Sequence, residues 1–483
     1  MKMKRNLKLY SVILLTMTLA SCKDLVSIPE PTGSVTTKKV FSTDAQATSA
    51  MAGVYTRMIN KTHEGTTGTQ GFAAGMSTIF GGMSGNELIT TSTANAYYGF
   101  NTNNLFTNDG SVAMIWGTAY DAVYGCNAVI EGIEASVSDK LHDNVRNRLI
   151  GEAKFVRAFS YFYLLNFFGD VPMALTIDFN KTATMKRTPK AEIYAQLIQD
   201  LLDAKNRLPD NFSGTGGQRI LPTKWAAVAL LARVYLYTGD YSNAAAQATE
   251  LISQSSLFKL PEDLNSVFLI NSEEAIWQLQ QGDLPANGKA TPEGFTLVAN
   301  KATILNDRPF FHMTDELKND FEANDQRKIA WTWNETTGGK EIYYPYKYKV
   351  GTYNARTGDM TEYYMVLRLA EQYLIRAEAQ ALANMPLGSA IADLNVIRHR
   401  AGLDDLPAGL SKPAVIQAIE HEREIELFAE WGHRFFDLKR TGRAENVLSI
   451  LPIKQPWRSD QLIYPIPKTE IIANQNLTQN PGY

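Results

Sequence analysis

Aromatic side chains set among amides in a predicted loop are the residues of this chain best suited to binding chemistry. Tyr97 and Tyr98 are adjacent, and Asn95 and Asn101 flank them. Sugar rings present flat apolar C–H faces that stack on aromatic rings, and their hydroxyls need fixed polar partners such as amides. The segment therefore predicts a binding site for an oligosaccharide, with no covalent step.

Two tryptophans form a second aromatic candidate. Trp331 and Trp333 alternate, so in a β-strand both would project from one face and could make a flat platform for a sugar. Tyr353, close to Arg356, is a further candidate for ligand binding. For each of these aromatic groups, the alternative is that the rings only pack a loop onto the rest of the fold.

The motifs of common enzymes are incomplete in this chain. His421-Glu422 begins like a zinc-protease helix, but Ile425 stands where the second histidine is required. Gly82–Gly85 only partly resembles a nucleophile elbow, because Asn86 replaces the last glycine and no strand precedes it. The six histidines show no metal-ligand spacing. Two carboxylates at a glycosidase's separation would leave no sequence signal. On the motifs, we predict no enzyme, no metal and no cofactor.

The first residues read as an export signal. Residues 1–21 combine a basic start with an apolar run from Leu9 to Leu19 that is too short to span a bilayer. The run ends in Leu-Ala-Ser before Cys22, which looks like a lipobox and predicts an acylated N-terminal cysteine; a plain cleaved secretory signal is the alternative. Residues 22–40, with Pro29 and Pro31, predict a tether.

The net charge argues against a nucleic-acid-binding protein, and the cysteine content argues against a protein stabilised by disulfides. Without residues 1–21 the chain loses four basic and no acidic residues, so its formal net charge falls from −3 to −7. This acidic balance without a basic stripe argues against a nucleic-acid partner. If Cys22 is acylated, Cys126 is the only remaining thiol and no intrachain disulfide is possible.

A helical hairpin is the clearest structural element. Trp225–Tyr237 carries one charge and many small residues, which predicts a helix buried nearly all round. Gly239 suits its end, and a second helix follows from about Ser242. The pattern resembles a tetratricopeptide hairpin, which needs neighbours to bury its apolar face.

Further helices are predicted on both sides of this hairpin, separated by two loop-rich regions, 61–111 and 260–364, in which the ligand-binding residues lie. The helical scaffold is predicted at about 41–60, 112–255 and 365–440, followed by an extended tail over 441–483. Within the second loop region, Ala275–Gln280 alternates like a strand. Residues 328–333 and 342–349 could pair as a hairpin around Gly338-Gly339. The charged block 420–434 has acids and bases three and four apart, which predicts structural ion pairs.

Several blocks together resemble the SusD/RagB family of outer-membrane lipoproteins. They are the lipobox at Cys22, residues 157–165 (RAFSYFYLL) with 168–172 (FGDVP), 368–378 (RLAEQYLIRAE), 395–402 (NVIRHRAG), 422–440 (EREIELFAEWGHRFFDLKR), 464–467 (YPIP) and 476–483 (NLTQNPGY). The resemblance implies one mainly α-helical domain over 41–483, with about four tetratricopeptide-like pairs and a loop-rich region carrying a few short strands on one side.

The resemblance also implies a function. Such proteins are not enzymes; they sit on the cell surface, held in the outer membrane by a lipid. There they capture nutrients, usually oligosaccharides, for a TonB-dependent, SusC-like transporter. The loops set ligand specificity, so starch, fructans, other glycans and peptides all stay open as ligands. A pure interaction protein is the other alternative, because tetratricopeptide grooves commonly hold peptides or subunits.

Overall fold

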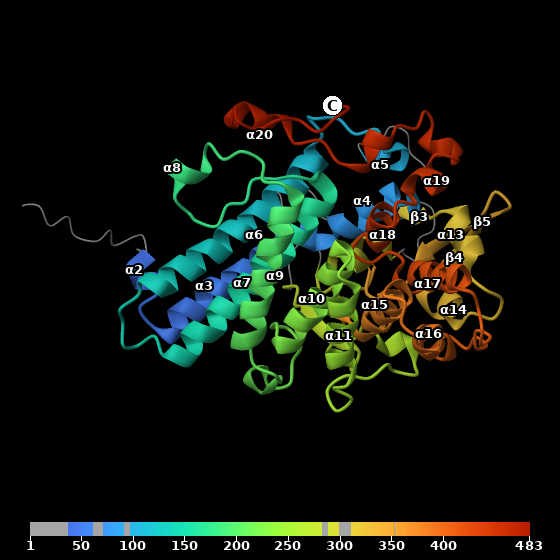
Figure 1. Cartoon of the computed structure of the whole chain (residues 1–483), viewed down its shortest axis with the longest axis horizontal. Helices are drawn as coiled ribbons and strands as arrows, with labels where there is room; N and C mark the ends of the chain where they lie inside the picture. Colours follow the sequence, from blue (N-terminus) through green and yellow to red (C-terminus); the bar gives the residue numbers. More distant parts are fainter. Residues whose placement is uncertain (1–36, 61–70, 91–96, 283–287, 299–310, 352) are drawn as a thin grey trace, which may run out of the picture.

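Long helices make up most of the structure, a computed structural model that describes residues 37–60, 71–90, 97–282, 288–298, 311–351 and 353–483 (Figure 1). Each long helix packs against the next one along the chain, from α3 at one end to α17 at the other. The fold is thus mainly α and tetratricopeptide-like, as predicted. The long helices are α3 (Asp44–Ile59), α6 (Gly110–Ala135), α7 (Asp143–Phe168), α9 (Lys190–Arg207), α10 (Lys224–Thr238), α11 (Tyr241–Ile252), α15 (Leu369–Leu382), α16 (Leu387–Arg400) and α17 (Lys412–Leu427).

The hairpin of α10 and α11 forms as its sequence predicts. Gly239 ends α10 in the left-handed conformation (φ 77°), and its N–H donates to carbonyls of the last turn. The Asp240 side chain then accepts a hydrogen bond from the Asn243 N–H and caps α11. Ala244 and Ala248 are fully buried against α10 and α15, so small side chains allow the three helices to approach closely.

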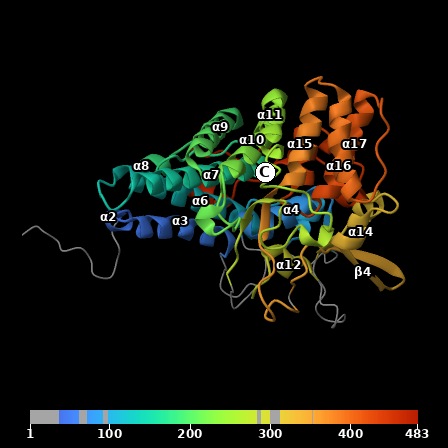
Figure 2. The same ribbon diagram turned by 90° about the horizontal axis from the view of Figure 1, so that it is seen from below.

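The short strands lie in the loop-rich part, on the side of the helical array that carries α12 (Pro292–Leu297) and α14 (Gln326–Trp331) in Figure 2. The predicted strand near 275–280 is confirmed. The hairpin around Gly338-Gly339 is confirmed as well, but its strands are residues 332–337 and 340–345 rather than 328–333 and 342–349. The strands form three antiparallel pairs in the described residues: β1 (Leu88–Thr90) with β3 (Phe311–Met313), β2 (Ala275–Leu279) with β6 (Tyr364–Arg368), and β4 (Thr332–Thr337) with β5 (Lys340–Pro345).

The prediction of a loop over residues 61–111 is wrong for residues 72–84. A π-helical turn, η2 (Phe72–Met76), and α4 (Ser77–Ser84) run through the middle of the molecule, with every side chain buried. The glycines of α4 are needed for contact rather than for turns: a Cβ on Gly81 would lie 2.7 Å from the Cα of Gly432. Glycine and small residues read as loop in sequence, but here they let a helix enter a crowded core.

The tail is not simply extended, which corrects a second prediction. After α18 (His433–Arg440) it forms α19 (Ala444–Leu448) and α20 (Lys468–Ala473), and it crosses back over the first half of the chain (Figure 1). The Tyr464 N–H donates to the Phe167 carbonyl at 2.8 Å, and the Asn480 side-chain amide donates to the Phe168 carbonyl at 2.9 Å. The tail therefore completes the end of α7. The other short helices are α2 (Thr37–Val40), α5 (Tyr98–Thr102), α8 (Phe179–Thr182) and α13 (Asp315–Asp320).

Buried ion pairs join the loop-rich part to the last long helices. Arg368, 2% exposed, donates to Glu430 at 2.8 Å and to Glu426 at 2.6 Å. Its third partner is Glu274, at 2.8 Å. The charged block 420–434 thus forms a lattice of ion pairs, as predicted, and its pairs through Glu422, Glu426 and Glu430 are sealed from solvent. Alongside Arg368, the cations of this buried lattice are Arg327, Lys347 and Arg400.

Glu293, on α12, gives the stability a pH dependence. Burial raises the pKa of Glu293 to about 8, although Thr78 and Tyr364 both donate hydrogen bonds to its Oε1. Since this value lies above the ordinary 4.5, the folded chain holds a proton that the unfolded chain releases between about pH 4.5 and 8. The stability contributed by this group is therefore complete below the unfolded pKa and is lost as the pH rises through the folded one.

We expect Glu293→Gln to remove this slope, which can reach about 1.4 kcal/mol per pH unit. Urea unfolding at about pH 5 and about pH 8 would measure it, with exposed Glu316→Gln as the matched control. An unchanged pH profile in Glu293→Gln would show that Glu293 is already ionised in the folded protein.

Candidate functional site

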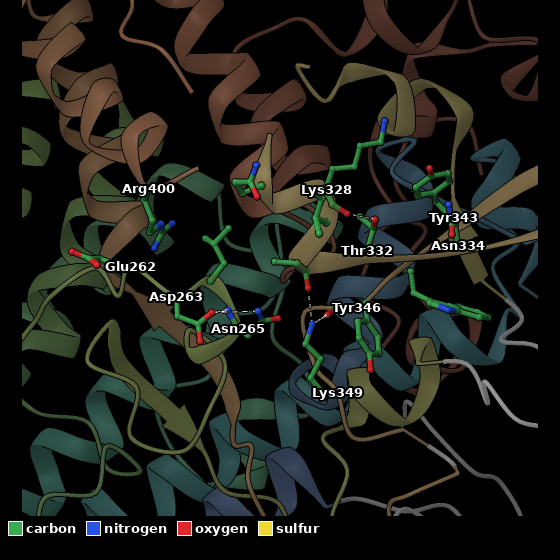
Figure 3. A pocket seen from close by; sticks show the side chains of 15 residues that line it. Glu262, Asp263, Asn265, Lys328, Thr332, Asn334, Tyr343, Tyr346, Lys349 and Arg400 are labelled. Carbon is green, nitrogen blue, oxygen red and sulfur yellow. Dashed lines mark hydrogen bonds between the residues drawn. The ribbon is translucent and has the colours of Figure 1, made fainter. Parts of the chain in front are cut away.

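A pocket of about 740 Å³ lies between α14, the β4–β5 hairpin and the segment after residue 261 (Figure 3). We call it the hairpin pocket. In the part of the chain that the structure describes, no three His, Cys, Asp or Glu residues are grouped to hold a metal ion. The hairpin pocket is lined by Glu262, Asp263, Leu264, Asn265, Gln326, Lys328, Ile329, Ala330, Thr332, Trp333, Asn334, Tyr343, Tyr346, Lys349 and Arg400.

Aromatic rings and amides of the hairpin form one wall of this pocket. Trp333 stacks on its cross-strand partner Tyr344, with ring centroids 5.2 Å apart, so its indole is held in one orientation. On the opposite face of the hairpin, Asn334 is paired with Tyr343. The hairpin therefore contributes a partly exposed ring, Trp333, from one face, and a ring paired with a side-chain amide, Tyr343 with Asn334, from the other.

Tyr346 and Lys349 form the adjoining wall. The ammonium of Lys349 lies 4.0 Å from the centroid of the Tyr346 ring and donates to the Ala330 carbonyl at 2.6 Å. Burial, followed by the neighbouring Tyr353 hydroxyl, raises the pKa of Tyr346 to about 12. Tyr346 is thus a neutral hydrogen-bonding ring at neutral pH, and Tyr353 lies beside the pocket.

The floor of the pocket is the buried ion-pair lattice. Arg400 lines the pocket, and its guanidinium donates to Glu274 and Glu426. Lys347, two residues before Lys349, donates to Glu430; burial lowers its pKa to about 8. Because these charges are paired and desolvated, the floor is stiff and offers little net charge to a ligand.

A second pocket, of about 480 Å³, lies where α5 meets the tail. We call it the tail pocket. Phe106 is 62% exposed at its edge, and Tyr98 is half-buried beside it. The tail pocket shares no lining residue with the hairpin pocket. It is lined by Tyr98, Gly99, Thr102, Asn104, Phe106, Asp109, Gln455, Pro456, Arg458 and Gln461.

The predicted ligand residues are therefore divided rather than assembled. Trp333 lines the hairpin pocket and Tyr98 the tail pocket. Tyr353 is 40% exposed next to Tyr346, and Arg356 is exposed on the same loop. Asn95 and Cys22 lie outside the described residues, as do the predicted signal and most of the predicted tether. The last residues of the predicted tether form α2, which begins at Thr37.

Two predicted contacts with a ligand are wrong. Trp331 ends α14 instead of lying in a strand, because Asp325 caps this helix and the strand begins only at Thr332. It is fully buried, and its indole N–H donates to the Leu264 carbonyl at 2.9 Å. It therefore shares no platform with Trp333.

Asn101 is the second correction. Its side chain bonds the backbone of Thr90, accepting from the N–H at 3.1 Å and donating to the carbonyl at 2.6 Å, so it holds α5 against β1. Tyr97 packs its ring against Phe80 at 5.2 Å and Phe311 at 5.8 Å. The side chains of Asn101 and Tyr97 therefore stabilise the packing of the fold.

Five lining residues were not predicted as ligand residues: Asn334, Tyr343 and Tyr346 in the hairpin pocket, and Phe106 and Arg458 in the tail pocket. The first two had a signal: counting outward from the Gly338-Gly339 turn places Asn334 opposite Tyr343. Phe106 and Arg458 had none, because only the folded tail brings them together.

Comparisons with known proteins cover both halves of the chain. The SusD family model matches residues 274–483, and the model described as "Starch-binding associating with outer membrane" matches residues 45–236. SusD-like protein P2 of Formosa agariphila is 27% identical over 516 aligned residues, covering 98% of both chains.

Solved structures agree with these matches. A SusD superfamily protein from Bacteroides vulgatus superposes with a TM-score of 0.77 at 23% identity, over 91% of this chain and 99% of that one. A structure named "Laminarin binding SusD-like protein" has a TM-score of 0.74 at 24% identity, over 92% and 100% of the two chains. With both halves matched by SusD models and the fold shared along nearly its whole length, the chain belongs to the SusD-like family.

Proposed function

We propose that this chain captures oligosaccharides, without chemistry, in the hairpin pocket. The observation that carries the proposal is the combination of Trp333, Tyr343 and Tyr346 with the amide of Asn334 around one pocket. Rings supply stacking area at a low cost in conformational entropy, and the amide gives hydroxyl groups a fixed partner. The paired charges in the floor favour a neutral or weakly charged glycan over a strongly acidic one.

The relatives support a glucan as the first ligand to test. One structural neighbour is named laminarin-binding, and a relative from Bacteroides thetaiotaomicron is named starch-binding protein SusD, 23% identical over 421 residues. We further propose that the chain hands its ligand to a SusC-like, TonB-dependent transporter. In this proposal it stands on the outer surface of the outer membrane, anchored by a lipid on Cys22. No helix in the described ranges is long and apolar enough to cross a membrane.

Calorimetric titration of residues 23–483 against oligosaccharides and peptides tests the proposal. We expect one sugar class to bind, and Trp333→Ala to weaken that binding about tenfold or more, equivalent to at least about 1.4 kcal/mol. Tyr124→Ala is the control, because this exposed ring on α6 lies in neither pocket.

Two results would contradict the proposal. Binding of peptides but of no sugar would keep ligand capture and overturn the glycan assignment. Sugar binding that is equally strong in Trp333→Ala and in the wild type would move the site away from the hairpin pocket.

A further inference from the structure

The tail pocket has the composition of a sugar site, although its elements are separate from those of the hairpin pocket. One wall comes from α5 and the loop after it, and the other from the tail at 455–461. We propose that the tail pocket is a second carbohydrate-binding site, specific for a neutral sugar unit. This inference rests on the proposed function, because it assumes that the chain captures glycans.

A buried lysine fixes the two walls relative to each other. Lys454, 1% exposed, stands next to pocket-lining Gln455 in the tail. Its ammonium donates to the side-chain oxygen of Asn103 at 2.9 Å and to the Met83 carbonyl at 2.8 Å. Asn103 itself follows α5 in the left-handed conformation (φ 53°). The pocket is therefore formed before any ligand arrives, as small-molecule sites usually are.

The polar groups of the tail pocket suit hydroxyls rather than charges. Arg458 is half-exposed and is paired with Asp460 at 3.1 Å, so its charge is compensated. The Oδ1 of Asp109 accepts from the N–H groups of Ser111 at 2.8 Å and Val112 at 3.2 Å, capping α6. Asp109 is the one carboxylate among the residues that line this pocket, and the helix cap engages one of its two oxygens.

The apolar groups add the stacking surface. Phe106 exposes most of its ring to solvent, and Tyr98 presents a ring with a hydroxyl from the adjacent helix. Covering an exposed phenyl ring removes apolar surface from water, which favours binding. A sugar would cover the ring with its C–H face while its hydroxyls reach Asn104 and Gln455, which lie on opposite walls.

Calorimetry with laminarihexaose and maltohexaose, on the full chain after its signal peptide, tests the inference. We expect two binding sites per wild-type chain for the glucan that binds. Trp333→Ala should retain the tail-pocket site, and Phe106→Ala in that background should weaken it at least tenfold. Phe179→Ala, an exposed ring on α8 outside both pockets, should leave both sites unchanged.

The outcomes separate this inference from the proposed function. A single site that Phe106→Ala and Tyr98→Ala leave untouched would overturn the inference alone. If Phe106→Ala instead weakened co-purification with the transporter, with sugar binding unchanged, the pocket would be a protein contact and the inference would be wrong. Failure of both glucans to bind the wild type would overturn the proposed function for neutral glucans, and this inference with it.

Discussion

Replacing Arg368 with methionine is expected to lower the free energy of unfolding by about 3–5 kcal/mol. Its guanidinium bonds three buried glutamates, Glu274, Glu426 and Glu430, at 2.6–2.8 Å. Methionine keeps much of the side-chain volume, but the three desolvated carboxylates lose one of the cations that compensate their charge. Since protonation of a glutamate relieves this cost, the deficit should be smaller at about pH 5 than at about pH 8.

Guanidinium-induced unfolding of the wild type and of Arg368→Met measures this effect. Lys259→Met is the matched control, because Lys259 and Glu273 are both largely exposed and 3.6 Å apart, and such a pair is worth about 1 kcal/mol at most. If Arg368→Met and Lys259→Met lost the same free energy of unfolding, burial in the lattice would not make an ion pair more stabilising. The affinity of the hairpin pocket should fall in Arg368→Met as well, since Arg400 shares Glu274 and Glu426 with Arg368.

Gly432→Ala is expected to destabilise the fold by about 3 kcal/mol, from backbone strain and overpacking together. Gly432 has φ 73°, and a Cβ at this position would lie 2.8 Å from the Ser77 carbonyl oxygen and 3.2 Å from the Cα of Gly81. Both neighbours are backbone atoms of α4, so the helix itself would have to move. Ala429 and Trp431, with φ 50° and 51°, already place strained backbone in the same turn.

Gly442→Ala separates the two causes of this loss. Gly442 has nearly the same conformation (φ 70°), but a Cβ there would meet nothing within 4 Å. We expect it to cost only about 1 kcal/mol, the conformational part. Thermal unfolding of both variants would give the difference. If Gly432→Ala and Gly442→Ala unfolded at the same temperature, the close approach of α4 to Gly432 would not contribute to the loss of stability.

The helical scaffold could be predicted because its signals are local. The apolar period of α10, the glycine at its end and the following Asp240 specify a hairpin without reference to the rest of the chain. For α4 the sequence was misleading, because Gly81 and Gly82 resemble loop residues when their tertiary neighbours are unknown. Trp331 was misplaced for a related reason: alternation with Trp333 fits a strand, but the cap at Asp325 extends a helix to that position.

Two of the predicted ligand residues, Trp333 and Tyr98, line pockets, but the grouping of residues around each pocket was not predicted. Tyr98 was named as a ring among amides, and Trp333 as a ring that alternates with Trp331 in a predicted strand. Which rings share a pocket depends on contacts between distant segments, such as Trp333 with Asn265, or Tyr98 with Arg458. No periodicity encodes these distances, so the division of the residues into two pockets was not visible in the sequence.

The hydrogen bonds from Tyr464 and Asn480 to the end of α7 also set an order of events in time. The carbonyls of Phe167 and Phe168 gain these partners only after about 300 further residues have left the ribosome. The first helices therefore cannot finish folding as they emerge, and closure by such distant contacts is slow. A chain that stays incompletely folded until its last segment is made can still be threaded through an export channel, which the proposed position on the outer surface of the outer membrane would require.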